Sequence, residues 1–128
     1  MKVSFDFDST LSEHKVQEYA KELVQRGFEV WIVTSRPEVY TGGYINFKPT
    51  NDDLFEVAED IGIKREHIHF TNYAFKSEFI EGKNFLFHLD DDVDELLSIL
   101  ETKDNCKPLN VFHDDWKQNC EDVITDIN

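Results

Sequence analysis

Short apolar segments alternate along the chain with longer stretches in which apolar residues recur every three or four positions. The apolar segments are rich in β-branched and aromatic residues and predict strands at about 3–7, 28–34, 67–71, 84–89 and 109–112. The stretches between them predict helices at about 13–26, 50–61, 77–81, 93–100 and 116–127. Strands that alternate with helices are typical of βαβ units, so we expect an α/β fold with a mainly parallel sheet.

Two of the predicted helices carry clear signals at their ends. Gly27 predicts the C-terminal end of the first helix. Thr50 and Asp53 have the spacing of a capping box and predict the start of the second helix. Between these helices, 35–50 is rich in turn-forming residues and is the one long stretch without a predicted helix or strand.

Length and composition favour one folded domain over 1–128. The chain has 128 residues, and domains cluster at roughly 100–150 residues. Hydrophobic residues make up 40% of it, which is enough to build a core and argues against disorder. An oligomer is compatible with the sequence but is not specified by it.

The charge balance narrows the range of partners and compartments. With 27 acidic and 13 basic residues the formal net charge is -14, so nucleic acid and an anionic membrane surface are not expected partners. No apolar run reaches the roughly 18 residues of a membrane span, and two aspartates among the first eight residues argue against a signal peptide. Cys106 and Cys120 lack CxxC spacing and are expected to be free thiols, so we expect a cytoplasmic protein.

Acidic residues follow two of the predicted strands. Asp6 and Asp8 lie at the end of the first strand, and in an extended chain a spacing of two points both side chains the same way. Asp90 and Asp91 follow the strand at 84–89. Ligands of open α/β sheets bind at the carboxyl ends of the strands, so we expect Asp6, Asp8 and Asp90 to converge there. Clustered carboxylates must bind protons or a cation, and oxygen ligands suit Mg²⁺ better than Zn²⁺.

Asp92 and Asp94 have a simpler explanation. They precede or open the predicted helix at 93–100. Acidic residues at this position favour the positive end of the helix dipole, so a structural role is expected for both.

Four short motifs, taken in order, resemble those of the haloacid-dehalogenase-like phosphohydrolase superfamily. The first is the DxD pattern of Asp6 and Asp8, and the second is Thr34 at the end of an apolar strand. The third is Lys76 before a short helix, and the fourth is the acidic pair that begins with Asp90. The resemblance spans about 3–95 and implies a three-layer, Rossmann-like fold with helices on both faces of the sheet.

The resemblance also implies a mechanism. Asp6 is the nucleophile that forms an aspartyl-phosphate, and Asp8 is the general acid and base. Thr34 hydrogen-bonds the phosphoryl oxygens, and Lys76 offsets their charge. Mg²⁺ is held by the Asp6 side chain, the Asp8 backbone carbonyl and Asp90, while Asp91 orients the water shell of the metal. The function implied is a Mg²⁺-dependent phosphatase.

The spacing of the motifs leaves no room for a large cap domain. A predicted helix follows Thr10 almost at once, and only about fifteen irregular residues follow Thr34. We therefore expect a capless member in which the segment 35–49 selects the substrate. Ser35 and Arg36 are the candidate substrate-binding residues, and Tyr40, Tyr44 and Phe47 of the same segment are candidates for stacking.

The substrate and the activity itself remain open at this stage. A small phosphorylated metabolite or nucleotide is the first choice. An open site also admits a macromolecular end, such as a nucleic-acid 3′-phosphate or a phosphoprotein, and a catalytically idle Mg²⁺-binding interaction module is a further alternative. A phosphorelay receiver domain is disfavoured, because it needs an acceptor Asp between the acidic pair and the Thr, and none lies between Asp8 and Thr34.

Overall fold

The computed structural model of the chain describes residues 1–41 and 49–126. Its strands are β1 (Lys2–Phe5), β2 (Glu29–Thr34), β3 (Ile68–Phe70), β4 (Phe85–Asp90) and β5 (Lys107–Asn110). Its helices are α1 (His14–Gln25), α2 (Asp52–Ile61), α3 (Ser77–Ile80), α4 (Val93–Glu101) and α5 (Trp116–Thr125), with short helical turns η1 (Phe7–Leu11) and η2 (Arg65–His67).

The five strands form one sheet in the order β3-β2-β1-β4-β5, and every neighbouring pair is parallel. The predicted α/β fold with a parallel sheet is therefore confirmed. The register pairs Phe5 of β1 with Leu89 of β4, and the Asp6 N–H donates to the Leu89 carbonyl at 2.9 Å. This pairing brings the acidic ends of the two strands, Asp6 and Asp90, to the same edge.

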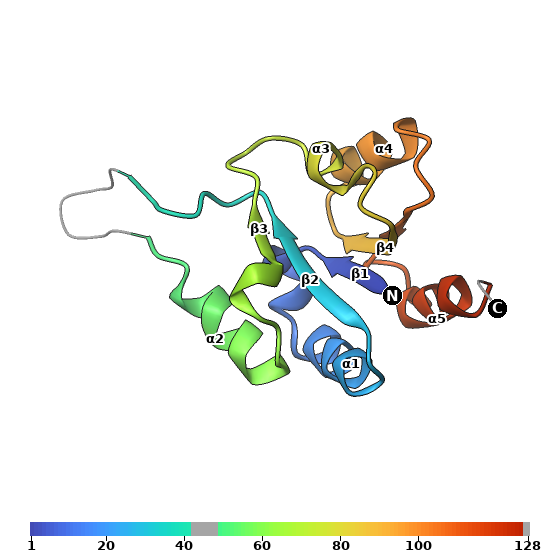
Figure 1. The fold of residues 1–128 in the computed structure, drawn as a ribbon, viewed down its shortest axis with the longest axis horizontal. Helices are drawn as coiled ribbons and strands as arrows, with labels where there is room; N and C mark the ends of the chain where they lie inside the picture. The colour runs from blue at the N-terminus through green and yellow to red at the C-terminus, as the bar shows by residue number, and fades with distance from the viewer. Residues whose placement is uncertain (42–48, 127–128) are drawn as a thin grey trace.

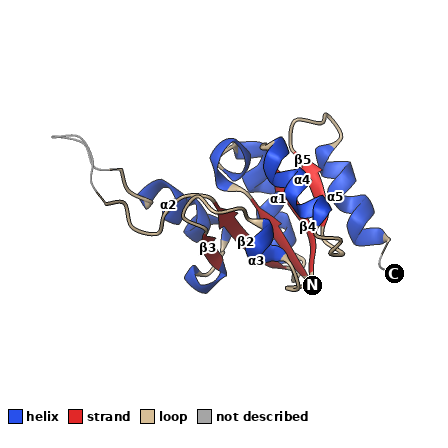
Figure 2. Cartoon of the chain, turned by 90° about the horizontal axis from the view of Figure 1, so that it is seen from above, coloured by secondary structure: helices blue, strands red, loops and turns tan. Residues whose placement is uncertain are grey.

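Helices cover both faces of the sheet, as expected for three layers. Figure 1 shows α1 and α2 on one side of the strands and α3 and α4 on the other, and Figure 2 shows the same layers from above. The larger hydrophobic core lies under α1, α2 and α5, where Tyr19 packs edge-on against Phe5 and Trp116. The smaller core, around Val33 and Ile99, lies under α3 and α4. No cap domain is present within the described ranges.

The helix α1 shows why the hydrophobic pattern was informative. The residues of α1 that the structure buries are Val16, Tyr19, Ala20 and Leu23, which recur at the three- and four-residue spacings from which the helix was predicted. The chain leaves the helix through Gly27, whose φ of 91° is costly for other residues, as predicted for a stop signal.

Three details differ from the sequence predictions. The first strand ends at Phe5 rather than at 7, because the chain turns into η1, and the last strand is Lys107–Asn110 rather than 109–112. The capping box at the start of α2 does not form. Asn51 is the N-cap residue, and the carboxylate of Asp53 accepts hydrogen bonds from Arg36 instead of capping the helix. A tertiary contact has replaced a local one.

Within the described part of the chain, no helix is long and apolar enough to cross a membrane. Cys106 and Cys120 are buried, free thiols, as predicted, and burial raises the pKa of each to about 12. Neither is poised to react as a thiolate.

Candidate functional site

The position of Asp6 is set by the end of the central strand. Val3, Ser4 and Phe5 are fully buried, and Asp6 follows in an extended conformation. The chain then turns into η1, where Phe7 and Leu11 are anchored in the core and the Leu11 N–H donates to the Asp6 carbonyl at 3.1 Å. Asp6 is thereby fixed with its carboxylate at the sheet edge, almost entirely buried.

Lys76 joins this strand end to the neighbouring one. Its ammonium donates to Asp6 Oδ1 at 2.7 Å and to Asp90 Oδ2 at 2.6 Å, and its side chain is only 2% exposed. Glu95 of α4 accepts the Lys76 backbone N–H through Oε1 at 3.2 Å, and its other oxygen lies 3.9 Å from the ammonium. We call these four residues the lysine cluster.

Asp90 is the most fully satisfied carboxylate of the lysine cluster. Besides the bond from Lys76, Asp90 Oδ2 lies 2.7 Å from His88 Nε2, and Oδ1 accepts the backbone N–H groups of Asp91 at 2.8 Å and of Asp92 at 3.1 Å. His88 Nδ1 lies 2.7 Å from Ser4 Oγ. We assign the tautomer in which His88 donates through Nε2–H and accepts from the Ser4 hydroxyl, since the carboxylate can only accept.

Burial and neighbouring charges shift the pKa values of the lysine cluster in different directions. Burial, and then the charge of Asp90, raise the pKa of Asp6 well above its ordinary value, although Lys76 opposes the shift. Burial alone would also raise the pKa of Asp90, but the hydrogen bond from His88 and the charge of Lys76 outweigh it and lower that pKa. Burial lowers the pKa of His88, which favours the neutral ring. Asp90 is therefore held as the anion, and Asp6 carries the unrelieved repulsion.

Asp91 completes a set of three carboxylates that fits a hard cation. One oxygen from each of Asp6, Asp90 and Asp91 lies within 4.8 Å of the others. These carboxylates and that of Glu95 outnumber the one ammonium of Lys76, so a bound cation would offset part of their repulsion. All of these donor atoms are carboxylate oxygens, which are ligands that hard cations prefer. The side chain of Asp8 is not part of this set, and its predicted backbone ligation stays a prediction.

Asp8 belongs instead to a second network, built on Arg36. The guanidinium donates to both oxygens of Asp8 at 3.0 and 2.7 Å and to both oxygens of Asp53 at 2.8 and 3.0 Å. A fifth bond reaches Asn51 Oδ1 at 3.3 Å, and the guanidinium lies over the Phe7 ring at 4.9 Å. We call these residues the arginine cluster. All five N–H donors of the guanidinium are engaged.

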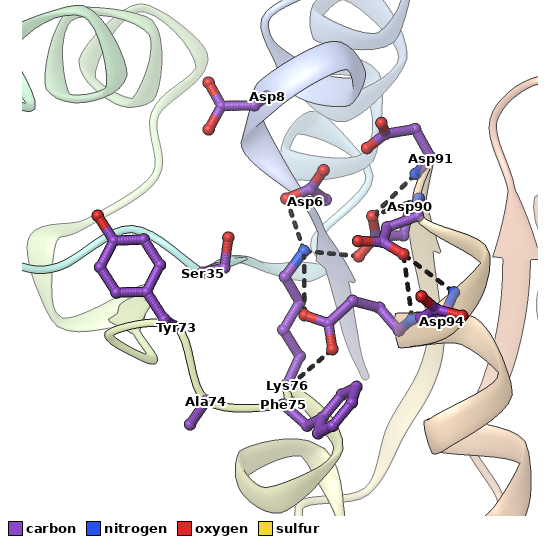
Figure 3. A pocket seen from close by; sticks show the side chains of 12 residues that line it. Asp6, Asp8, Ser35, Tyr73, Ala74, Phe75, Lys76, Asp90, Asp91 and Asp94 are labelled. Atoms are coloured by element: carbon purple, nitrogen blue, oxygen red, sulfur yellow. Dashed lines mark hydrogen bonds and ion pairs between the residues drawn. The ribbon is translucent and has the colours of Figure 1, made fainter.

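The divergence of Asp6 and Asp8 corrects one expectation. Their side chains were expected to point the same way along an extended strand, but β1 ends at Phe5 and Asp8 lies inside η1. Figure 3 shows the two carboxylates apart, with Asp6 at Lys76 and Asp8 toward the rim of the pocket. The twofold alternation of side chains holds only while the strand continues.

The two clusters border a pocket of about 430 Å³ at the carboxyl edge of the sheet. The described residues that line it are Asp6, Asp8, Ser35, Tyr73, Ala74, Phe75, Lys76, Asp90, Asp91, Asp92, Asp94 and Glu95. Thr34 is fully buried behind this lining, and its Oγ1 accepts the Arg36 backbone N–H at 3.3 Å. Ser35, one residue further on, is the residue of this strand end that faces the pocket (Figure 3).

The structure thus brings together most of the predicted residues, but not all of them. Asp6, Lys76 and Asp90 meet directly, while Thr34 and Arg36 do not line the pocket. Tyr44 and Phe47 lie outside the described residues. The structural role expected of Asp92 is confirmed, because its carboxylate accepts the Asp94 and Glu95 N–H groups at the start of α4.

Some pocket residues carry no signal in the sequence. Glu95 sits on the buried side of α4, and no break in the apolar pattern singles it out. Tyr73 and Phe75 lie in a loop, where single aromatic residues are uninformative. Only the fold shows that these residues reach one site.

Fold and site together define the class of protein: a parallel α/β domain with an open acidic pocket at the carboxyl edge of its sheet. Comparison with protein-family models, with curated proteins and with solved structures finds no match to this chain.

Proposed function

We propose that this protein is a Mg²⁺-dependent phosphomonoester hydrolase of the capless haloacid-dehalogenase-like type that its motifs resemble. The observation that carries the proposal is the buried ammonium of Lys76 between Asp6 and Asp90, at 2.7 and 2.6 Å, on the floor of an open pocket. A carboxylate nucleophile beside a fixed cation suits phosphoryl transfer, in which catalysis is mostly positioning and charge stabilisation.

The reaction takes two steps at phosphorus. Asp6 attacks, so that a P–O bond to its carboxylate forms and the bond to the leaving alkoxide breaks, while Asp8 gives the alkoxide a proton. Asp8 then takes a proton from water, the water oxygen attacks phosphorus, and Asp6 is released with inorganic phosphate. Both oxygens of Asp8 accept bonds from Arg36, so Asp8 must give up at least one of them to transfer a proton.

The other residues of the pocket support these steps. Lys76 stays against Asp6 and offsets the charge of the phosphoryl group. Ser35 lines the pocket where Thr34 does not, which favours its hydroxyl as the donor to the phosphoryl oxygens. Mg²⁺ bound at Asp6, Asp90 and Asp91 would reduce the repulsion between the anionic nucleophile and the anionic substrate. The buried free thiols suit the reducing cytoplasm, where we place the activity.

The direct test is hydrolysis of p-nitrophenyl phosphate with Mg²⁺, with EDTA, and with two matched variants. We expect turnover that EDTA abolishes, and loss of turnover in Asp6→Asn. Asp60→Asn is the control, because Asp60 is exposed on α2 away from the pocket. A phosphorylated protein should be detected by mass spectrometry in acid-quenched samples of the wild type and be absent from Asp6→Asn.

Two results would contradict the proposal. Wild-type turnover by Asp6→Asn would exclude Asp6 as nucleophile. Binding of Mg²⁺ without turnover of any phosphomonoester in a metabolite panel would favour the idle binding module instead.

A further inference from the structure

Two aromatic side chains border the same pocket as the lysine cluster. Tyr73 is 74% exposed and Phe75 is 53% exposed, and both line the pocket floored by Asp6 and Lys76. Figure 3 shows Tyr73 across the pocket from Asp6, with Ser35 between them, and Phe75 beside Lys76. Exposed rings at the mouth of a polar pocket offer a flat apolar surface within reach of a ligand bound at its floor.

The loop that carries Tyr73 is held in place by its backbone. Asn72 and Tyr73 both have positive φ, of 53° and 68°, a conformation that residues other than glycine rarely adopt. The Tyr73 N–H donates to the Ser35 carbonyl at 2.7 Å, and the Asn72 N–H donates to the Arg36 carbonyl at 3.2 Å. The ring is thus attached to the same strand end that supplies Ser35, on a loop already fixed before a ligand arrives, which lowers the entropy cost of binding.

The charges around the pocket limit what a phosphorylated ligand can carry besides its phosphate. Of the described lining residues, seven are acidic and one, Lys76, is basic. Lys76 is already shared by Asp6 and Asp90, and the five donors of Arg36 are all engaged. A second phosphate on the ligand would lie among these seven acidic residues, which we call the acidic rim, and no free cation among the lining residues would offset its charge. At such distances salt screens the repulsion only partly.

We infer that the substrate is a monoester with a single phosphate, carried by a molecule with an aromatic heterocycle, such as a nucleoside monophosphate, and that Tyr73 and Phe75 bind this ring. The inference rests on the proposed phosphatase chemistry for the phosphate end of the ligand. Aromatic stacking on a base is worth a factor of about 5 to 150 in affinity. The acidic rim then selects against bisphosphates and against nucleic-acid ends.

The test compares two substrates that differ only in the ring. Adenosine 5′-monophosphate and ribose 5-phosphate release the same kind of primary alkoxide, so the difference in kcat/KM reports recognition of the base. We expect the wild type to favour the nucleotide by about 5- to 150-fold. Tyr73→Ala should lose most of this preference, because kcat/KM should fall much more for the nucleotide than for ribose 5-phosphate, and Tyr73→Phe should keep it. Phe112→Ala is the control, because Phe112 is 71% exposed and does not line the pocket.

A third substrate tests the acidic rim. Adenosine 3′,5′-bisphosphate has the same base and the same 5′-phosphate, and it should be hydrolysed less efficiently than the monophosphate. The gap should narrow as salt is added, because the repulsion is screened. A preference for the bisphosphate would overturn the charge argument and point to a nucleic-acid end.

A binding measurement separates this inference from the proposed function. Isothermal titration of the Asp6→Asn variant with each ligand in Mg²⁺ measures ring recognition without turnover. Tyr73-dependent binding of the nucleotide, in a protein whose wild type hydrolyses neither ligand, would support ring recognition and overturn the phosphatase. Equal hydrolysis of both ligands, unchanged in Tyr73→Ala, would overturn ring recognition and leave the phosphatase. If neither ligand is hydrolysed or bound, both the phosphatase and ring recognition are overturned.

Discussion

Lys76 and Arg36 each hold two aspartates on opposite sides of one pocket, but in different surroundings. Lys76, Asp6 and Asp90 are all buried, and the ammonium has more carboxylate around it than it can neutralise. Arg36 is 14% exposed, while its partners Asp8 and Asp53 are 57% and 59% exposed, and every guanidinium donor is used. We therefore expect the lysine cluster to be stabilised by a bound cation, whereas the guanidinium of the arginine cluster has no donor left for a ligand.

The difference has a physical basis in solvation. Water screens the exposed carboxylates of the arginine cluster, so their mutual repulsion is weak. The hydrogen bonds of Arg36 join η1, the end of β2 and the start of α2. The carboxylates of the lysine cluster have lost their water and repel one another, so they gain from any cation that enters.

The largest effect should follow from Lys76→Met. Removing the buried cation leaves Asp6 and Asp90 without a positive charge to offset their repulsion, and breaking a buried pair in this way costs about 3–5 kcal/mol. Urea unfolding followed by circular dichroism measures the loss. Lys117→Met is the control: its pair with Glu22 is 3.8 Å apart and half exposed, and its loss should cost less than about 1 kcal/mol.

A second variant keeps the test informative if Lys76→Met does not fold. In Lys76→Met/Asp6→Asn one of the two unpaired charges is gone, so part of the stability should return. A loss in Lys76→Met no larger than in the Lys117 control would mean that Lys76 does not offset a buried repulsion between Asp6 and Asp90.

A smaller loss, about 2 kcal/mol, should follow from Arg36→Gln, since its charge-assisted hydrogen bonds are made to carboxylates that regain water. Because no guanidinium donor is left for a substrate, kcat should fall about tenfold or more through misplacement of Asp8 while KM stays nearly constant. Arg65→Gln is the control for loss of an arginine charge, since the Arg65 guanidinium lies over the Phe55 ring, at 3.4 Å from its centroid, rather than at Asp8. A rise in KM at constant kcat would instead support the direct substrate contact expected from the sequence.

Divalent cations should stabilise the lysine cluster and leave the arginine cluster unaffected. At ten times its Kd, Mg²⁺ should add about 1.4 kcal/mol to the free energy of unfolding, and EDTA should remove it. Asp91→Asn should lose most of this gain, whereas Asp53→Asn should keep it. Calorimetric melting with and without Mg²⁺ measures both, and an equal gain in the two variants would place the cation elsewhere.

The smallest effect concerns pH and the arginine cluster. Hydrogen bonds from Arg36 lower the pKa of Asp53 below its ordinary 3.8. A carboxyl whose pKa is lowered by folding adds stability above its unfolded pKa and loses it as pH falls through the folded pKa. The free energy of unfolding of the wild type should therefore exceed that of Asp53→Asn by at most about 1 kcal/mol at pH 7, because the carboxylate that pairs with Arg36 is exposed. Urea unfolding at pH 7 and pH 3 should show that this difference in the free energy of unfolding is smaller at pH 3. A larger difference in acid would contradict the lowered pKa of Asp53.

The sequence by itself determined the order of the strands and helices along the chain and the strand ends that carry the chemistry. Hydrophobic periodicity is a local property, so the buried face of α1 and the apolar strands β2 and β4 could be recognised without the fold. Because parallel strands present their carboxyl ends at one edge, Asp6 and Asp90 could also be expected to meet there.

The tertiary structure alone decided what each polar side chain touches. Whether Asp8 faces Asp6 depended on where β1 ends, and whether Asp53 caps α2 depended on a guanidinium from another segment. The placing of Ser35 rather than Thr34 in the pocket lining, together with Tyr73 from a loop and Glu95 from α4, followed from segments that meet only in the folded chain. These contacts join residues far apart in the chain, and no local pattern encodes their distances.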